Sequence, residues 1–381
     1  MKLMHLGDLH LGKHVHEFSM IEDQRYILKE IIQIAKEQSV DAVLIAGDLY
    51  DRSLPGEEAV ILFDTFLTEL ADLGKSVFVI SGNHDSEERL NFGSRLFRSN
   101  QIYITGKYKG EMECIDLEDA YGPLHIWMMP YIKASRVAYY YPEEDTSSYE
   151  AAFRTALSKC DISSSERNVI LLHQFVIGAS GDPQAAGSES SLLSVGTIEK
   201  VSADCFDDFD YVAMGHIHTP QAVGRETCRY AGSPLKYSLN QRELNSQKSV
   251  TLITMEEKGK VIVESLPLKP LREIRRIYGK LEDLLAHAAD TEDYIYATLT
   301  DEIVPFDAMA RLREVYPNTM KLDYDNEAYR ALEILEEESG SAGKSFQELF
   351  FEFYHFIHGR EPNEEEWEVL EEIAREAGVM E

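Results

Sequence analysis

Five largely apolar runs in the chain each end in aspartate, asparagine or histidine, side chains that bind metals and transfer protons. These polar positions are Asp8 and His10, Asp48, Asn83 with His84 and Asp85, His173, and His216 with His218. Short runs of β-branched and apolar residues that stop at a glycine or a polar residue are typical of buried strands. Because α/β sheets bind ligands at the loops after the carboxyl ends of their strands, we expect these side chains to gather at one sheet edge.

The residue types match a centre of divalent metal ions. Mixed oxygen and imidazole ligands without thiolate suit ions such as Mn²⁺. Clustered carboxylates and histidines would repel one another or lose solvation without cations. Two ions roughly 3.5–4 Å apart share a bridging ligand, for which Asp48 is the natural candidate. The expected remaining ligands are Asp8, His10 and His218 at one ion, and Asn83, His173 and His216 at the other.

Helices are expected between the first three strands. Apolar residues recur at helical spacing over residues 20–38 and 57–73. The alternation of strands and helices predicts a parallel sheet. The second helix is apolar around much of its circumference. Either it is buried on two sides, or it forms a two-fold dimer interface together with the first helix.

Further strands are expected beyond residue 101, at 102–105, 112–117 and 124–128, and as a hairpin at 249–254 and 260–266. The segment 178–196 is rich in Gly, Ser and Ala, and its position after His173 indicates an active-site loop. A domain boundary is expected near residues 267–270. The predicted domains are a main domain of residues 1–270, a small α+β capping domain of residues 271–335, and a helical element of residues 344–381.

The helical element carries more aromatic surface than a lone pair of helices can bury. Phe350, Phe353 and Phe356 fall on one face of a helix predicted at 346–357, and Trp367 begins an apolar stripe on a second helix at 364–377. These stripes either pack on each other or dock into the groove of a partner. The preceding segment 340–345 ends like a phosphate-binding loop but lacks its first glycine, which favours a flexible joint.

Composition restricts the class of protein. The formal charge of −31 over 381 residues argues against a protein that coats nucleic acid by electrostatics. It does not exclude a nuclease, because Arg89, Arg95, Arg98, Lys107 and Lys109 cluster after the third motif. This cluster is either a phosphate-binding rim or a solvated helix face. Arg89, together with Arg52, is a candidate for substrate binding.

Location and redox state are also constrained. No apolar run approaches the roughly 20 residues of a membrane helix. No basic-then-apolar signal segment is expected, because a strand already leads to Asp8. We therefore expect a cytoplasmic, nucleoid-associated protein. The four cysteines lie far apart and lack C-x-x-C spacing, so we expect reduced thiols.

The motifs and their order resemble the calcineurin-like metallophosphoesterases and, more closely, the SbcD family, the nuclease subunit of the bacterial SbcC–SbcD complex. The stretches that carry the resemblance are GDLHLG at 7–12, GDLYDR at 47–52, SGNHDS at 81–86 and GHIH at 215–218. The resemblance covers residues 1–270 through motifs and the remainder through organisation only. It implies an α/β fold, a β-sandwich flanked by helices, with the small cap and the C-terminal helical pair.

The same resemblance implies a function. It implies a manganese-dependent double-strand exonuclease and single-strand or hairpin endonuclease that processes DNA ends in repair and recombination with the ATPase SbcC. His84 would be the histidine that contacts the scissile phosphate without binding a metal. A homodimer is also implied, and the C-terminal helices would dock on the coiled-coil base of SbcC.

Two other interpretations remain open. Residues 47–53 are close to the G-D-x-x-D-R-G motif of protein phosphatases, which would favour a phosphomonoesterase, although Ser53 replaces the last glycine. A binding or scaffold protein on the same fold is the second, but it has little reason to keep every ligand.

Overall fold

The computed structural model describes residues 1–179, 181–185, 199–288, 291–326, 347–348, 350–351, 354–355 and 360–376. The chain divides into two compact units, Met1–Ile274 and Arg275–Glu381. The predicted joint at 340–345 lies outside the described residues, as do most of the predicted helix at 346–357 and most of the loop at 178–196.

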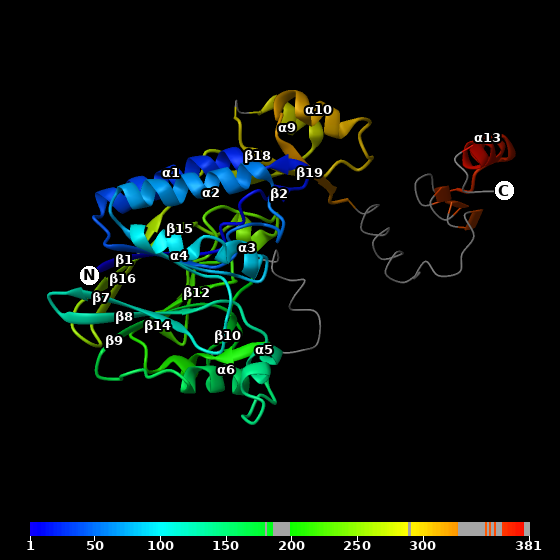
Figure 1. Ribbon diagram of the computed structural model, residues 1–381. Helices are drawn as coiled ribbons and strands as arrows, with labels where there is room; N and C mark the ends of the chain where they lie inside the picture. The colour runs from blue at the N-terminus through cyan, green and yellow to red at the C-terminus, as the bar shows by residue number, and fades with distance from the viewer. Residues whose placement is uncertain are drawn as a thin grey trace. The chain divides into compact units, whose positions relative to one another are not determined.

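The first unit contains two six-stranded sheets that pack face to face (Figure 1). The first sheet consists, in spatial order, of β16 (Val261–Pro267), β15 (Ser249–Met255), β1 (Lys2–Leu6), β4 (Ala42–Ala46), β5 (Ser76–Ile80) and β6 (Ile102–Thr105). Strands β1, β4, β5 and β6 are parallel, and β15 of the β15–β16 hairpin pairs antiparallel with β1. The parallel sheet and the closing hairpin predicted from the sequence are both confirmed.

The second sheet holds the other two strands that carry site residues. Its spatial order is β13 (Gln221–Val223), β14 (Arg225–Tyr230), β12 (Tyr211–Gly215), β9 (Arg167–His173), β8 (Gly122–Met129) and β7 (Glu113–Asp119). Strands β8, β9, β12 and β14 are parallel. The polar positions therefore follow strands of two sheets, where the sequence had suggested a single sheet edge.

Layering explains why the central strands are apolar on both faces. All five residues of β4 and of β5 are buried, because their inner face meets the second sheet and their outer face is covered by helices. Leu44 and Phe78 pack against Ile126 and Leu171 of the second sheet in the core between the sheets.

Helices α1 (Ile21–Glu37) and α2 (Glu57–Asp72) lie on the outer side of the first sheet (Figure 1), within one residue of the predicted spans. Ile27, Ile31 and Ala35 bury the apolar stripe of α1. Helices α5 (Ala134–Tyr140) and α6 (Tyr149–Ser158) cover the outer face of the second sheet. Shorter elements of this unit are β2 (His14–Val15), β3 (Phe18–Ser19), α3 (Glu87–Asn91), α4 (Ser94–Phe97), β10 (Phe175–Ile177), β11 (Lys200–Ser202) and α8 (Gln241–Leu244).

The second unit begins with the predicted strand-helix-strand-helix-strand order. Its elements are β17 (Ile274–Gly279), α9 (Leu281–Ala286), β18 (Tyr294–Leu299), α10 (Ala308–Val315) and β19 (Thr319–Tyr324). The strands form one sheet with β18 in the centre, and Ile295, Leu299 and Leu312 contribute to its core. Helix α13 (Glu364–Glu376) matches the second helix predicted in the C-terminal element.

Candidate metal centre

Loops from both sheets converge at the carboxyl ends of β1, β4, β5, β9 and β12. The backbone N–H groups of Asp8 and His10 donate to the carbonyl oxygens of Gly47 (3.1 Å) and Asp48 (2.9 Å), which joins the first two loops. The N–H of His216 donates to Asp8 Oδ1 at 2.9 Å, which joins the fifth loop to the first. The loops are thus held together by hydrogen bonds between residues up to 208 positions apart.

Four of the predicted ligands have strained backbones. Positive φ angles occur at Asp8 (52°), His10 (44°), Asp48 (49°) and His216 (98°). Residues other than glycine rarely adopt this region, which costs on the order of 1–3 kcal/mol for each residue. Strain of this kind, concentrated in one cluster, is typical of functional sites.

One half of the cluster contains Asp8, His10 and His218. Ligand atoms from these three buried residues all lie within 4.8 Å of one another. The Nε2 atoms of His10 and His218 are only 3.0 Å apart. Two imidazole nitrogens that face each other so closely, beside a carboxylate, form a donor set that suits a divalent cation.

The other half contains Asn83, His173 and His216. The Asn83 Oδ1 atom lies 3.0 Å from His173 Nε2 and 3.1 Å from His216 Nδ1. Asp48 Oδ2 lies 3.3 Å from His173 Nε2 and 3.6 Å from His10 Nε2, so its carboxylate stands between the two halves. All seven predicted ligands are therefore brought into one cluster.

Burial keeps most of these imidazoles neutral. It lowers the pKa of His10 and His216 to about 3 and holds the pKa of His218 well below its usual range. A neutral imidazole has a free lone pair, which a metal ligand requires. In His173, Nδ1 donates to the Ala46 carbonyl at 2.8 Å, which leaves Nε2 directed at Asp48 and Asn83.

His173 and Asp48 shift the pKa values of each other, because His173 Nε2 and Asp48 Oδ2 lie 3.3 Å apart. Burial opposes the charge on His173, yet the adjacent Asp48 carboxylate raises the pKa of His173 to about 9. Burial also opposes the charge on Asp48, but His173 holds the pKa of that carboxyl well below its usual range. A cation at this position would displace the proton of His173.

Asp85 is not one of the predicted ligands, but its side chain joins the loop after β4 to the loop after β5. Its carboxylate accepts hydrogen bonds from the backbone N–H groups of Leu49 (3.1 Å), Tyr50 (3.1 Å) and Gly82 (2.9 Å). Asp48 and Asn83 are therefore presented by loops that share one buried anchor. The sequence shows Asp85 within a motif, but it does not reveal this role.

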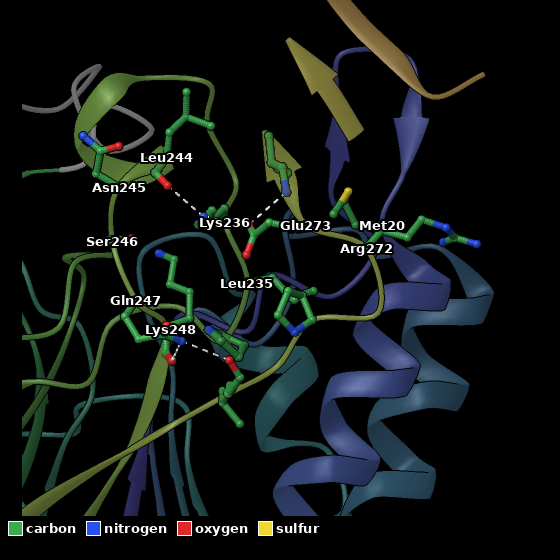
Figure 2. A pocket seen from close by; sticks show the side chains of 14 residues that line it. Met20, Leu235, Lys236, Leu244, Asn245, Ser246, Gln247, Lys248, Arg272 and Glu273 are labelled. Carbon is green, nitrogen blue, oxygen red and sulfur yellow. Dashed lines mark hydrogen bonds and ion pairs between the residues drawn. The ribbon is translucent and has the colours of Figure 1, made fainter. Parts of the chain in front are cut away.

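Lys248 supports the loop of His218 through a hydrogen bond to its backbone. Its buried ammonium group donates to the His218 carbonyl, to Ser233 Oγ and to Glu243 Oε1, each at 2.9 Å. Figure 2 shows Lys248 at the wall of a small cavity of about 190 Å³. No sequence motif marks this lysine, because its partners lie up to 30 residues away.

Tyr237 is a second supporting residue that the sequence does not identify. Its hydroxyl group donates to the Leu9 carbonyl at 2.6 Å, and its ring packs edge-on against His10 and His218 with centroids 5.8 and 6.1 Å apart. The ring therefore fixes both imidazoles from one side.

The three remaining predicted residues are not among the clustered ligands. His84 borders the cluster, because its ring packs edge-on against that of His10 with centroids 4.9 Å apart. His84 is exposed; its backbone N–H donates to Asp48 Oδ1 at 2.9 Å and its Nδ1 donates to the Asp51 carbonyl at 3.0 Å. The Arg52 side chain is 80% exposed and lies 3.7 Å from Asp51. Arg89 is exposed within α3. A substrate role for these two arginines stays a prediction.

Two family models match parts of the chain. Residues 1–220 match the family model of calcineurin-like phosphoesterases. Residues 267–356 match the SbcD_C model, described as the type 5 capsule protein repressor C-terminal domain. The SbcD subunit of the nuclease SbcCD from Staphylococcus epidermidis is 33% identical over 328 residues, which cover 84% of this chain and 85% of that protein.

Weaker similarities to solved structures include a dimetal phosphatase from Danio rerio and GAP50, the anchor in the inner membrane complex of Plasmodium. The first is 11% identical, with a TM-score of 0.39, over 71% of this chain and 98% of the other. The second is 16% identical, with a TM-score of 0.39, over 71% of this chain and 89% of the other. The family model and the staphylococcal relative together show that the chain belongs to the calcineurin-like phosphoesterases and, among them, to the SbcD family.

Proposed function

We propose that the chain is a metal-dependent DNA nuclease, a double-strand exonuclease and single-strand or hairpin endonuclease that acts in DNA end processing, repair, recombination and replication. The observation that carries this proposal is the cluster of seven oxygen and imidazole ligands, six of them buried, in a relative of the SbcCD nuclease. Purified protein with Mn²⁺ should cleave linear duplex and hairpin DNA. Hydrolysis of a phosphomonoester alone would instead indicate a phosphatase.

We propose two divalent ions and, from the resemblance to the SbcD family, Mn²⁺ as their identity; a mixed oxygen and imidazole donor set accepts such an ion. Asp8, His10 and His218 would hold one ion, Asn83, His173 and His216 the other, and Asp48 both. Bound ions would polarise the phosphate and lower the pKa of a bound water. The chain itself supplies a largely buried and pre-arranged donor set, in which strained backbones and anchors such as Asp85 fix the side chains before substrate arrives.

His84 is proposed as the proton donor to the leaving oxygen. Its Nδ1 is occupied by the Asp51 carbonyl, so Nε2 of the exposed ring is the nitrogen left to face a substrate. We expect His84→Gln to lower turnover about 10²–10⁴-fold, the usual contribution of a positioned acid or base, with unchanged metal content. His287→Gln is the matched control, because Nδ1 of His287 also contacts a backbone carbonyl. Loss of metal from His84→Gln would make His84 a ligand.

A homodimer is proposed through an exposed apolar patch on α2 and the segment after α3. The exposed fractions are 44% for Val60, 56% for Ile61, 84% for Phe92 and 77% for Leu96. The apolar stripe of α1, by contrast, is buried within the chain, which moves the proposed interface away from that helix. An exposed apolar patch of this kind is typical of interaction surfaces.

Introducing charge should separate the dimer. We expect the Phe92→Glu/Leu96→Glu variant to be a monomer at tens of micromolar by light scattering, because burying two carboxylates would cost more than the interface provides. Phe306→Glu is the control, since Phe306 is 93% exposed and belongs to the second unit. A wild-type chain that is already monomeric would contradict the proposal.

We propose SbcC as the partner and the C-terminal helices as the docking element. The relative is part of a nuclease named SbcCD. In α13, Val369 and Ile373 are 57% and 56% exposed, which leaves apolar surface for a partner groove. We expect a chain truncated before Lys344 to keep metal-dependent cleavage of short DNA but not to co-purify with SbcC. Undiminished binding of the truncated chain would exclude this dock.

The described helices include none that is both long and apolar enough to cross a bilayer. We propose a cytoplasmic, nucleoid-associated location on the ground that the proposed substrate is DNA.

A further inference from the structure

A pocket of about 620 Å³ adjoins the Asn83 and His173 side of the metal centre, between α3 and α5. The link runs through Tyr131, whose backbone N–H donates to the Ser81 carbonyl at 2.9 Å, two residues before Asn83. The ring of Tyr131 lies 6.4 Å from that of His173. The next residue, Ile132, accepts a hydrogen bond from Gln174, the neighbour of His173. The pocket wall is therefore fixed to two ligand loops.

The charge of this pocket differs from that of the chain as a whole. Lys107, Lys133 and Arg136 line it against one carboxylate, Glu87, in a chain of net charge −31. Lys107 and Arg136 are already neutralised in part, since each forms an ion pair with Glu87, at 3.5 and 3.1 Å, and Lys107 also contacts Glu88. Lys133 is exposed and has no carboxylate partner among the described residues, which leaves its ammonium group for a phosphate.

Aromatic rings form much of the remaining wall. Four of the ten lining residues are tyrosines. Tyr140 packs edge-on between Tyr108 and Tyr139, with centroids 5.9 and 5.2 Å apart, so the rings support one another. Tyr139 at the end of this row is 78% exposed. Tyr139 thus offers an exposed ring that Tyr140 supports, in a pocket that Lys133 also lines. These are the features of a surface on which the bases of single-stranded nucleic acid stack.

We propose that this pocket binds an unpaired nucleotide of the DNA strand being cleaved, with its base against Tyr139 and an adjacent phosphate at Lys133. The proposal rests on the proposed nuclease function, because the bound strand would lead from the pocket to the metal centre. A base can stack on a protein ring only when it has left its own stack, so the pocket selects frayed ends, hairpin loops and single strands over intact duplex.

Two probes separate stacking from charge. The full chain with Mn²⁺ is titrated by fluorescence anisotropy against a phosphorothioate-linked oligothymidylate, which resists cleavage, and against an abasic strand of the same length and linkage. Tyr139→Ala should weaken oligothymidylate binding roughly tenfold and leave abasic binding unchanged. Lys133→Ala should weaken both and reduce the salt dependence by about one phosphate contact. The controls are Tyr121→Ala, whose ring lines a different pocket, and Lys29→Ala on α1.

The outcomes distinguish this proposal from the one on which it rests. Bis(p-nitrophenyl) phosphate is a phosphodiester that carries no nucleobase, so its hydrolysis reports on the metal centre alone. All four variants should hydrolyse it as the wild-type chain does. Unchanged oligothymidylate binding by Tyr139→Ala, or equal weakening on the abasic strand, would overturn the stacking assignment. A wild-type chain that hydrolyses neither this diester nor DNA would overturn the nuclease function instead.

Discussion

The Asp48→Ala variant is expected to lose both metal ions and all measurable cleavage. Asp48 stands between the two halves of the cluster, 3.3 Å from His173 and 3.6 Å from His10, so its carboxylate is placed to contact both proposed ions. Removing its carboxylate also removes the group that raises the pKa of the buried His173. The loss of activity should exceed the about 10²–10³-fold cost of removing a single transition-state donor.

Mass spectrometry of the purified Asp48→Ala variant measures its metal content. Nuclease activity and a thermal melt are measured on the same sample. His218→Ala should lose mainly one ion, because His218 belongs to the half that contains Asp8 and His10. Asp72→Ala at the exposed end of α2 should match the wild-type chain in all three measurements. Two ions per chain in Asp48→Ala would show that the ligand assignment is wrong.

Much of the fold could be predicted because it depends on local pattern. The helical spacing in α1 and α2 and the continuous apolar runs of β4 and β5 arise from burial of each element against its immediate neighbours. The gathering of the site residues follows from a general property of parallel strands, whose carboxyl ends share an edge. Local pattern did not show that β9 and β12 belong to a second sheet, since strand order depends on long-range pairing.

The supporting residues of the site could not be predicted for the same reason. Tyr237 contacts a carbonyl 228 residues away, and Lys248 contacts the backbone of His218 within a polar network that no short motif encodes. Both occupy ordinary sequence surroundings. Their roles follow only from the packing of distant segments, whereas most of the ligands themselves stand in glycine-containing motifs at strand ends.

The glycines of those motifs show a further difference between sequence and structure. In the sequence, Gly82 and Gly215 serve only as signals that a strand ends. In the structure, a Cβ atom on Gly82 would overlap the carboxylate and backbone nitrogen of Asp48, and one on Gly215 would overlap the Ala46 carbonyl oxygen. These glycines are needed because two backbones approach each other so closely that no side chain fits between them.

Gly215→Ala is therefore expected to disrupt the centre although it removes no ligand. The new Cβ atom would lie far inside the 3.0 Å that real Cβ atoms keep from Ala46 O, and 2.7 Å from His173 Nδ1. Since Ala46 O is also the acceptor that orients His173, relief of the clash must move that imidazole. We expect destabilisation by about 1–3 kcal/mol and a roughly 10–100-fold loss of metal affinity, as for other changes that disturb the support of a ligand.

Isothermal titration with Mn²⁺ and chemical denaturation of the same variant measure the two effects separately. Gly56→Ala is the matched control, because Gly56 has an ordinary φ of −67° and no atom within 4 Å of the added methyl group. If Gly215→Ala bound two ions with wild-type affinity, His173 would have to be oriented by contacts other than the Ala46 carbonyl. The close contact between Gly215 and Ala46 would then contribute to packing of the two sheets but would not be required for metal binding.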